Sequence, residues 1–261
     1  MMGDVAVVGW GAYVSGYGSL ADWLAGRAAS EPTAPVGSMV PLRDRRRASP
    51  LSRAMADAYG AAVAEAGFDP AQVASVFGSA LGEVSTMIGL LDQMWSEAGT
   101  PLSPMKFATS VHNAASGMIS IANGNRGFTT SLGADYDTPA MGLLEGIGLV
   151  ASRGEPVVVC CGDEPPPDDL VPGQQGWSLL SVAIALAPVE RAKAGATVLS
   201  APELVASALP APETDVALGR NPSIGLFDLA VALERGLEGV IRLDRGAGRG
   251  YCVRLKPDRA A

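Results

Sequence analysis

Histidine and cysteine are scarce in this sequence. The 261 residues include one histidine, His112, and three cysteines. A metal site usually needs several histidine, cysteine or carboxylate ligands at short spacing, and His112 has no such neighbour in the sequence, so we expect no metal site. A hydrolytic triad is incomplete as well, because no Gly-x-Ser-x-Gly nucleophile turn is present. Cys160 and Cys161 are adjacent and would point to opposite faces of a strand; with Cys252 they form an odd set that favours buried, reduced thiols over a disulfide.

Basic residues are the minority charge. The chain has 19 Lys and Arg against 27 Asp and Glu, a net charge of −8, so we expect no binding of nucleic acid or anionic membrane. The longest uncharged apolar stretch, residues 179–188, is shorter than the roughly 20 residues that a membrane-spanning helix needs. The N-terminus has no basic region before an apolar stretch, which argues against a secretory signal. These absences predict a cytoplasmic protein.

A phosphate-binding loop is also missing. Gly9-Trp10-Gly11 lacks the third glycine of a dinucleotide-binding turn, and no lysine follows a glycine run as in a Walker motif. We therefore expect no nucleotide and no other cofactor.

The residues that are abundant predict an α/β fold. Hydrophobic residues make up 48% of the chain, and 32 glycines and 19 prolines suit many short turns between strands and helices. The acidic, proline-rich residues 163–172 are expected to form a surface loop. The alternation of buried-type strands with amphipathic helices predicts a mostly parallel sheet covered on both faces. Strands are predicted at 5–10, 73–78, 129–134, 156–161 and 179–187, helices at 20–26, 51–67, 85–97, 112–122, 139–152 and 227–237, and a C-terminal hairpin at 240–243 and 251–255.

Five short motifs occur in an order that resembles a known family. They are Gly78-Ser79-x-x-Gly82, Ser103-Pro104, Ser110-x-x-Asn113-x-x-x-Gly117, Asn125-Arg126-Gly127, and Gly162-Asp163-Glu164 after a strand. The series resembles the N-terminal half of the β-ketoacyl synthases over residues 5–190, and the family pattern fits residues 125–164 without a gap. This resemblance implies a thiolase-like half-fold with a mixed, mostly parallel sheet, helices on both faces, and a short C-terminal helix plus hairpin. It divides the chain into a synthase-like domain, residues 1–190, and a short extension packed on it, residues 191–261.

The resemblance also locates the position of the synthase nucleophile. In the family, an arginine-glycine turn leads into a short strand and then to a cysteine at a helix N-terminus, where the helix dipole activates the thiol. The matching residue here is Tyr136, between Asp135 and Asp137. A phenol has a pKa of about 10 and is a poor nucleophile at neutral pH. The family takes two histidines from its C-terminal half, and the residues after 190 contain none. We therefore expect a non-catalytic relative.

These losses resemble the small chain-length-factor-like subunits that accompany ketosynthases in aryl polyene and type II polyketide pathways. The resemblance implies a heterodimer with an active β-ketoacyl synthase subunit, in aryl polyene or fatty-acid-like polyketide synthesis. The partner would supply the cysteine and the histidines and would meet the acyl carrier protein. A homodimer is an alternative if the partner is absent.

Several side chains are candidates for the acyl tunnel of such a pair. Tyr136, with Asp135 and Asp137, would form a plug or wall of the tunnel; a residue that merely fills a dead site is an equal alternative. Met87 and Leu91 would line the tunnel, since flexible methionines adapt to an acyl chain, although ordinary core packing explains them too.

Other side chains are candidates for contact with a partner. The resemblance places His112, Asn113, Gly117 and Met118 by the dimer contact, where His112 would be a hydrogen-bonded residue rather than a general base. The cluster Arg43, Arg45, Arg46 and Arg47 could dock an acidic carrier protein, or it could be a solvated loop.

Two other functions remain open from the sequence. The first is a stand-alone acyl-thioester hydrolase, or acyl-binding protein, that uses His112 with a nearby carboxylate and water. The second is a scaffold protein that has kept the fold without an activity, since a shared fold does not fix function.

Overall fold

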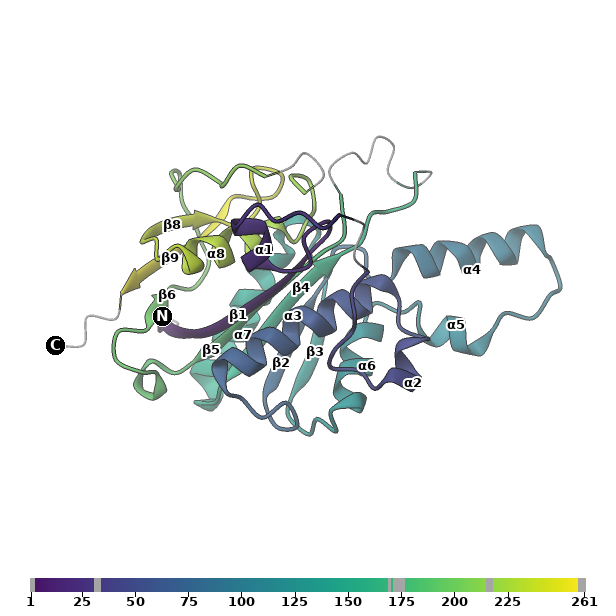
Figure 1. The fold of residues 1–261 in the computed structure, drawn as a ribbon, viewed down its shortest axis with the longest axis horizontal. Helices are drawn as coiled ribbons and strands as arrows, with labels where there is room; N and C mark the ends of the chain where they lie inside the picture. Colours follow the sequence, from purple (N-terminus) through teal and green to yellow (C-terminus); the bar gives the residue numbers. More distant parts are fainter. Residues whose placement is uncertain (1–2, 31–33, 169, 171–176, 215–217, 258–261) are drawn as a thin grey trace.

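The described residues of the chain form one mixed sheet. The structure is a computed structural model, and it describes residues 3–30, 34–168, 170, 177–214 and 218–257. The strand order is β3-β2-β4-β5-β1-β6-β9-β7, and β8 pairs with β9 (Figure 1). The strands are β1 (Val5–Val14), β2 (Ala74–Gly78), β3 (Thr129–Leu132), β4 (Val157–Asp163), β5 (Leu180–Ala187), β6 (Thr197–Leu199), β7 (Glu203–Leu204), β8 (Gly239–Arg242) and β9 (Tyr251–Pro257).

Parallel pairing is concentrated in the β3-β2-β4 part of the sheet. There β2 lies parallel to both β3 and β4, whereas β5 lies antiparallel to both β4 and β1. The mixed sheet is as expected, but its antiparallel share is larger than the alternation of strands and helices suggests. The reason is that no helix lies among the described residues between β4 and β5, and without a crossover helix the chain returns antiparallel beside the strand it has just left.

Helices cover both faces of the sheet. One core contains α3 and α6, and the other contains α1, α7 and α8. Cys160 faces the first core and Cys161 the second, and all three cysteines are buried and free, as predicted. The helices are α1 (Leu20–Leu24), α2 (Leu42–Arg45), α3 (Pro50–Ala66), α4 (Val84–Ser96), α5 (Pro104–Ala108), α6 (Ala114–Ala122), α7 (Thr138–Arg153) and α8 (Ile224–Glu234), with short 3-10 turns η1 (Asp135–Asp137) and η2 (Val189–Arg191).

Helix α3 shows how local sequence signals fix this architecture. The Ser49 side chain accepts a hydrogen bond from the Ser52 N–H, and Gly67 ends the helix at a φ of 67°, which confirms both predicted ends. The helix lies so close to β1 that a Cβ on Gly11 would stand 2.5 Å from the Ala58 carbonyl oxygen. Gly9 and Gly11 thus serve close packing of strand and helix, and not a phosphate turn.

The C-terminal hairpin extends the main sheet. Strand β9 pairs with β6, which pairs with β1, and β8 pairs with the other side of β9. Helix α8 covers this part and is buried from Ile224 to Leu233, consistent with its almost uniformly apolar sequence. The very short strands β6 and β7 were not predicted, because two or three residues carry no periodicity.

Helices α4 and α5 form an arm that projects from the body of the molecule (Figure 1). Only Val84 and Leu90 of α4 are buried, while Trp95 is 92% exposed. No helix in the described part of the chain is both long enough and apolar enough to cross a membrane.

Candidate functional site

The carboxyl ends of three parallel strands meet at one edge of the sheet. Ser79 follows β2, Gly133 follows β3, and Asp163 is the last residue of β4. In α/β sheets, side chains that follow parallel strands gather at such an edge, which is the usual place of a ligand or active site. The candidate site is therefore built from these three strand ends.

A tight turn between β3 and α7 carries Tyr136, at the position that the resemblance assigns to the synthase nucleophile. Asp135 has a φ of 52°, in the left-handed region that side-chain-bearing residues seldom adopt. The buried Thr138 stabilises the turn: its Oγ1 accepts a hydrogen bond from the Ala134 N–H (3.0 Å) and donates one to the Asp135 carbonyl oxygen (2.6 Å). Tyr136 thus lies in the turn that precedes the first residue of α7.

The Tyr136 ring is half-buried against Trp177. The two rings meet edge to face, with centroids 6.1 Å apart and planes at 82°. Trp177 is itself buried, and its indole Nε1 has no hydrogen-bond partner in the structure as described. The two rings therefore pack together beside the N-terminal end of α7, in the edge-to-face geometry that aromatic pairs prefer.

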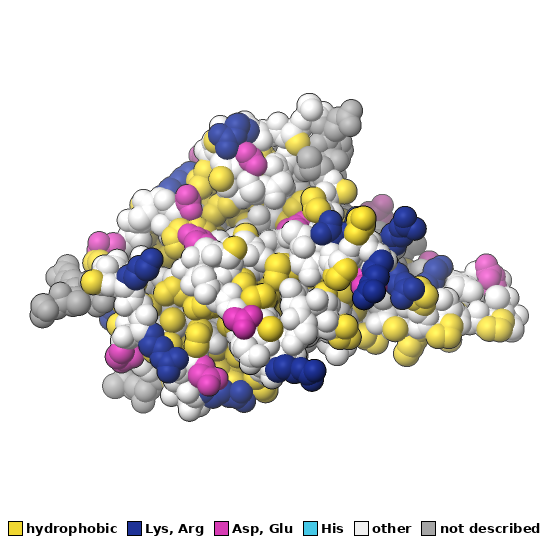
Figure 2. Space-filling view, turned by 60° about the horizontal axis from the view of Figure 1, so that its bottom comes forward, with side chains coloured by type: hydrophobic (Ala, Val, Ile, Leu, Met, Phe, Trp, Pro, Cys, Tyr) yellow, Lys and Arg dark blue, Asp and Glu magenta, His cyan; other side chains and the backbone are white. Residues whose placement is uncertain are grey.

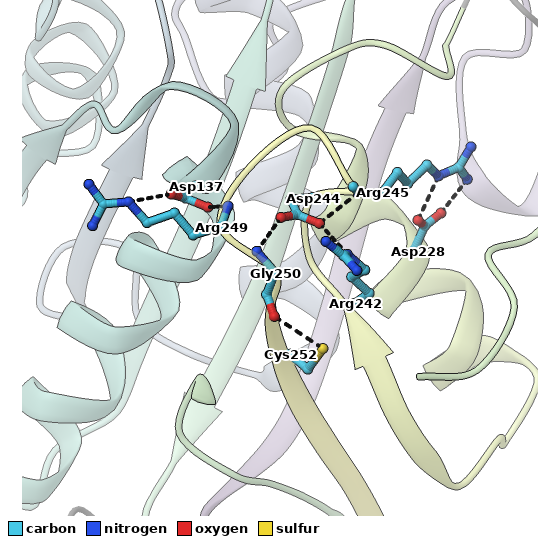
Figure 3. A network of polar contacts seen from close by, with 9 residues as sticks. Asp137, Asp228, Arg242, Asp244, Arg245, Arg249, Gly250 and Cys252 are labelled. Carbon is cyan, nitrogen blue, oxygen red and sulfur yellow. Dashed lines mark hydrogen bonds and ion pairs between the residues drawn. The ribbon is translucent and has the colours of Figure 1, made fainter. Parts of the chain in front are cut away.

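The two carboxylates beside Tyr136 differ in their surroundings. Asp135 is exposed, whereas Asp137 contacts the turn between β8 and β9 (Figure 3). Its Oδ1 accepts a hydrogen bond from the Arg249 N–H at 2.9 Å, and its Oδ2 lies 3.6 Å from Arg249 Nε. The C-terminal hairpin therefore contacts the turn that carries Tyr136.

Asp163 is a buried carboxylate that joins three segments. Its Oδ1 accepts hydrogen bonds from Ser79 Oγ (2.8 Å) and the Ala80 N–H (2.7 Å), and its Oδ2 accepts one from Ser223 Oγ (2.6 Å). Burial raises the pKa of Asp163 to about 6, although these hydrogen bonds oppose the shift. Ser223 precedes α8, so one carboxylate connects the ends of β2 and β4 to that helix.

Sequence reasoning missed this role of Asp163. The expectation of a surface loop that begins at residue 163 is wrong at its start, because β4 continues through Asp163, which pairs with Leu180 of β5. Its place in the sequence was the signal that could have predicted this role. Asp163 comes two residues after a fully apolar run, at the carboxyl end of a parallel strand. Residues 169 and 171–176 of the expected loop lie outside the described residues.

Two further carboxyl groups anchor the base of the arm. Ser52 Oγ donates a hydrogen bond to Glu83 at 2.5 Å, and the Ser85 N–H donates one to Glu164 at 2.9 Å. Burial raises the pKa of both carboxyl groups, and Glu164 raises that of Glu83 further. Among the residues that the structure describes, no three His, Cys, Asp or Glu side chains are grouped so that they could hold a metal ion.

A comparison with protein families assigns most of the chain to one family. The family model of the β-ketoacyl synthase N-terminal domain matches residues 21–221. The chain belongs to this family. The match extends beyond residue 190, into β6 and the segment before α8. No curated protein matches this synthase-family chain.

Solved structures show the same thiolase-like ketosynthase fold. A chain from the ketosynthase ApeO in complex with its chain length factor ApeC, from Xenorhabdus doucetiae, is 19% identical with a TM-score of 0.68; the match covers 97% of this chain and 99% of that one. The ishigamide ketosynthase/chain length factor is 15% identical (TM-score 0.60, 76% and 66% covered). A β-ketoacyl synthase from Burkholderia phymatum is 12% identical (TM-score 0.59, 72% and 60% covered). At these identities the likeness concerns the fold.

His112 makes a structural hydrogen bond in this synthase-like fold. Its Nε2 lies 2.8 Å from the Ser79 carbonyl oxygen, which can only accept, so Nε2 carries the proton. A Cβ on Gly133 would stand 3.0 Å from Nε2, and one on Gly82 would stand 3.1 Å from the ring. The imidazole thus bridges the segments after β2 and β3. The Ser79 hydroxyl donates to Asp163 and not to His112, so the structure shows no serine nucleophile paired with this imidazole.

Within the described ranges of the chain, no element covers the edge strand β3 or the outer side of α6. β3 is an edge strand of the sheet, and Ile121 on α6 is 84% exposed. A groove of about 460 Å³ lies between α2, α5 and α6. Asn113, Gly117 and Met118 line this groove, and a Cβ on Gly117 would meet nothing within 4 Å. The small residue is therefore not used for packing within this chain.

The arginine cluster and the arm border the same face. Arg43 and Arg47 line the groove, and Arg45 Nε donates a hydrogen bond to the Val40 carbonyl oxygen at 2.6 Å. Figure 2 shows basic side chains gathered at the base of the arm and hydrophobic side chains along it.

The two proposed tunnel residues on α4 lie on this arm. Met87 and Leu91 are exposed, so core packing within this chain does not explain them. They lie on α4, whereas Tyr136 lies in the turn before α7 and packs against Trp177.

Proposed function

We propose that this chain is a non-catalytic, chain-length-factor-like subunit that pairs with an active β-ketoacyl synthase. The observation that carries the proposal is the turn before α7, where the synthase family has its cysteine and this chain has Tyr136. A thioester needs a sulfur atom, which the phenol of Tyr136 lacks, so the acyl chain cannot be held here as it is on the cysteine of a synthase. The three thiols of the chain offer no substitute, since all are buried and burial raises the pKa of each thiol.

The unpartnered face supports a synthase as the partner. An edge strand with free backbone groups is a template for pairing with another chain, and β3 is such an edge. Ile121 on α6, which contacts β3, and Phe107 and Trp95 on the arm are exposed apolar side chains as well. A partner of the same family, with its own apolar face, would cover them. The likeness to ketosynthase and chain-length-factor complexes agrees with this assignment.

In this proposal the partner performs the condensation and meets the acyl carrier protein, in aryl polyene or fatty-acid-like polyketide synthesis in the cytoplasm. The present chain shapes the space into which the acyl chain grows. Tyr136 and Trp177 form the wall at which growth stops. The hydrolase alternative receives no support from Ser79, whose hydroxyl donates to Asp163 and not to His112.

Substitution of Tyr136 tests this role. The Tyr136→Ala variant, reconstituted with the synthase, should give products longer by about one or two two-carbon units, because the removed ring spans several bonds of about 1.5 Å. Mass spectrometry of the acyl products measures the change. Tyr136→Phe keeps the ring against Trp177 and is the matched control, with an unchanged distribution expected. Identical products from Tyr136→Ala and the natural chain, with pairing intact, would exclude the wall function.

A further inference from the structure

The turn between β8 and β9 is fixed by hydrogen bonds of its own and by contacts with α8 and with Asp137 (Figure 3). Within the turn, Asp244 is buried and accepts hydrogen bonds from the Gly246 N–H (2.8 Å), the Gly250 N–H (2.6 Å) and Arg242 Nε (2.6 Å). These bonds fix the shape of the turn from the inside. They also leave the backbone of Gly248 and Arg249 facing outward, toward α7.

A second ion pair ties the turn to α8. Arg245, which has a φ of 49°, donates to Asp228 from Nε (2.7 Å) and from Nη2 (2.5 Å), a two-bond geometry that fixes the guanidinium plane. Nη1 of the same side chain donates to Thr214 Oγ1 at 2.7 Å. Since Asp228 is buried in α8, the turn is held to the rigid part of the fold.

The third contact is with Asp137, next to Tyr136. A Cβ on Gly248 would stand 2.3 Å from Asp137 Oδ1, so the carboxylate fits against the turn only because residue 248 is glycine. Asp137 is also the N-cap residue of α7, yet its side chain makes no capping bond to its own helix. An aspartate at this position usually accepts from the first-turn N–H groups. Here it accepts from the Arg249 N–H, 112 positions away in the sequence.

The segment around Tyr136 is therefore held at both ends. Thr138 bonds to Ala134 and Asp135 on the inner side, and the C-terminal turn bonds to Asp137 on the outer side. With its two neighbours fixed, the direction of the Tyr136 side chain toward Trp177 is fixed as well.

We propose that Asp137, clamped by residues 248–249 of the C-terminal turn, is a positioning residue that holds the Tyr136 ring at the depth where acyl growth stops. This inference rests on the proposed function of Tyr136. It assigns the C-terminal extension a part in setting product length, although none of its residues contacts the acyl chain in this arrangement.

The Gly248→Ala variant tests the contact between Asp137 and the C-terminal turn without changing Tyr136 or its neighbours in the sequence. Its methyl group would displace the Asp137 carboxylate, and we expect the share of longer products to rise at least about twofold, because ångström-scale looseness in a supporting shell is enough to alter a site. Asp137→Ala removes the carboxylate without adding bulk and should shift products in the same direction. Arg254→Ala, which breaks an exposed ion pair with Glu203 elsewhere on β9, is the matched control and should leave products unchanged.

Three readouts separate the possible outcomes: the product distribution, the yield of the heterodimer, and the melting temperature of each variant. Longer products with heterodimer yield intact support the clamp. If Tyr136→Ala lengthens the products but neither Gly248→Ala nor Asp137→Ala does, the clamp is overturned and the function of Tyr136 stands. If Tyr136→Ala also has no effect, the proposed function itself fails. A lower melting temperature with unchanged products would reduce the clamp to a structural contact and overturn the proposal.

Discussion

An aspartate in place of Ile121 is expected to prevent pairing with the synthase. Ile121 is 84% exposed on α6 and lines the groove beside the β3 edge, so a partner that covers this face would bury it. A carboxylate buried there without a counter-ion would cost several kcal/mol. We therefore expect the affinity of the Ile121→Asp chain for the synthase to fall at least about 100-fold, which corresponds to about 3 kcal/mol. Sedimentation velocity at several concentrations of the two subunits measures this change.

The substitution should leave the isolated chain folded. An exposed side chain contributes little to monomer stability, so the melting temperature of the variant alone should change by a few degrees at most. Leu204→Asp is the matched control: Leu204 is 67% exposed on β7, at the opposite end of the sheet from β3. It should pair normally. Equal pairing by both variants would show that the face of β3 and α6 is not the interface.

The second large effect is expected at Asp163. Asp163→Ala leaves the hydroxyls of Ser79 and Ser223 and the N–H of Ala80 without their acceptor inside the protein. Buried donors without partners destabilise the folded state, and we expect a loss of about 2–4 kcal/mol in the free energy of unfolding. Asp163→Asn is the matched variant, since its Oδ1 still accepts from Ser79 and Ala80, and its Nδ2 can donate to Ser223. It should be as stable as the natural chain at neutral pH, or more stable.

The pH dependence of stability, compared between the natural chain and Asp163→Asn, gives a sharper test. The pKa of Asp163 is raised from 3.8 to about 6 in the folded state, so the folded state holds this proton more tightly than the unfolded state. Stability from this group is therefore present below about pH 4 and is lost as the pH rises through about 6, by roughly 3 kcal/mol in all. Asp163→Asn removes that dependence. Its stability relative to the natural chain should rise between pH 4 and pH 7, as measured by urea unfolding.

Parallel stability curves for the two proteins over that pH range would show that Asp163 does not titrate with a raised pKa. A large loss of stability in Asp163→Asn at neutral pH would show that the ionised carboxylate itself is required.

Much of the fold follows from local sequence signals. The ends of α3 are readable from Ser49, Pro50 and Gly67, and the buried run of β4 is recognisable from its apolar residues alone. The antiparallel insertion of β5 between β4 and β1 was not predicted, because periodicity does not reveal which strands become neighbours. The short β6 and β7 exist because β9 pairs with them, which is a tertiary cause.

The site was predicted in part. The place of Tyr136 before α7 follows from the ungapped family pattern, but its contact with Trp177 joins segments 41 positions apart and has no local signal. The contact between Asp137 and Arg249 is of the same kind. On α4, the spacing of Met87, Leu90 and Leu91 is equally typical of a core and of an interface, and only the structure shows that Leu90 alone of the three is buried.

The most direct test of the account is the mass of the complex. This chain would be co-expressed with a β-ketoacyl synthase of the same organism, and the purified material analysed by size-exclusion chromatography with light scattering and by a condensation assay on the pair and on each subunit. The account predicts a stable one-to-one heterodimer, with condensation that requires the synthase cysteine and gives products whose length depends on Tyr136. A chain that stays apart from an excess of synthase, while the synthase alone makes the same products, would contradict it.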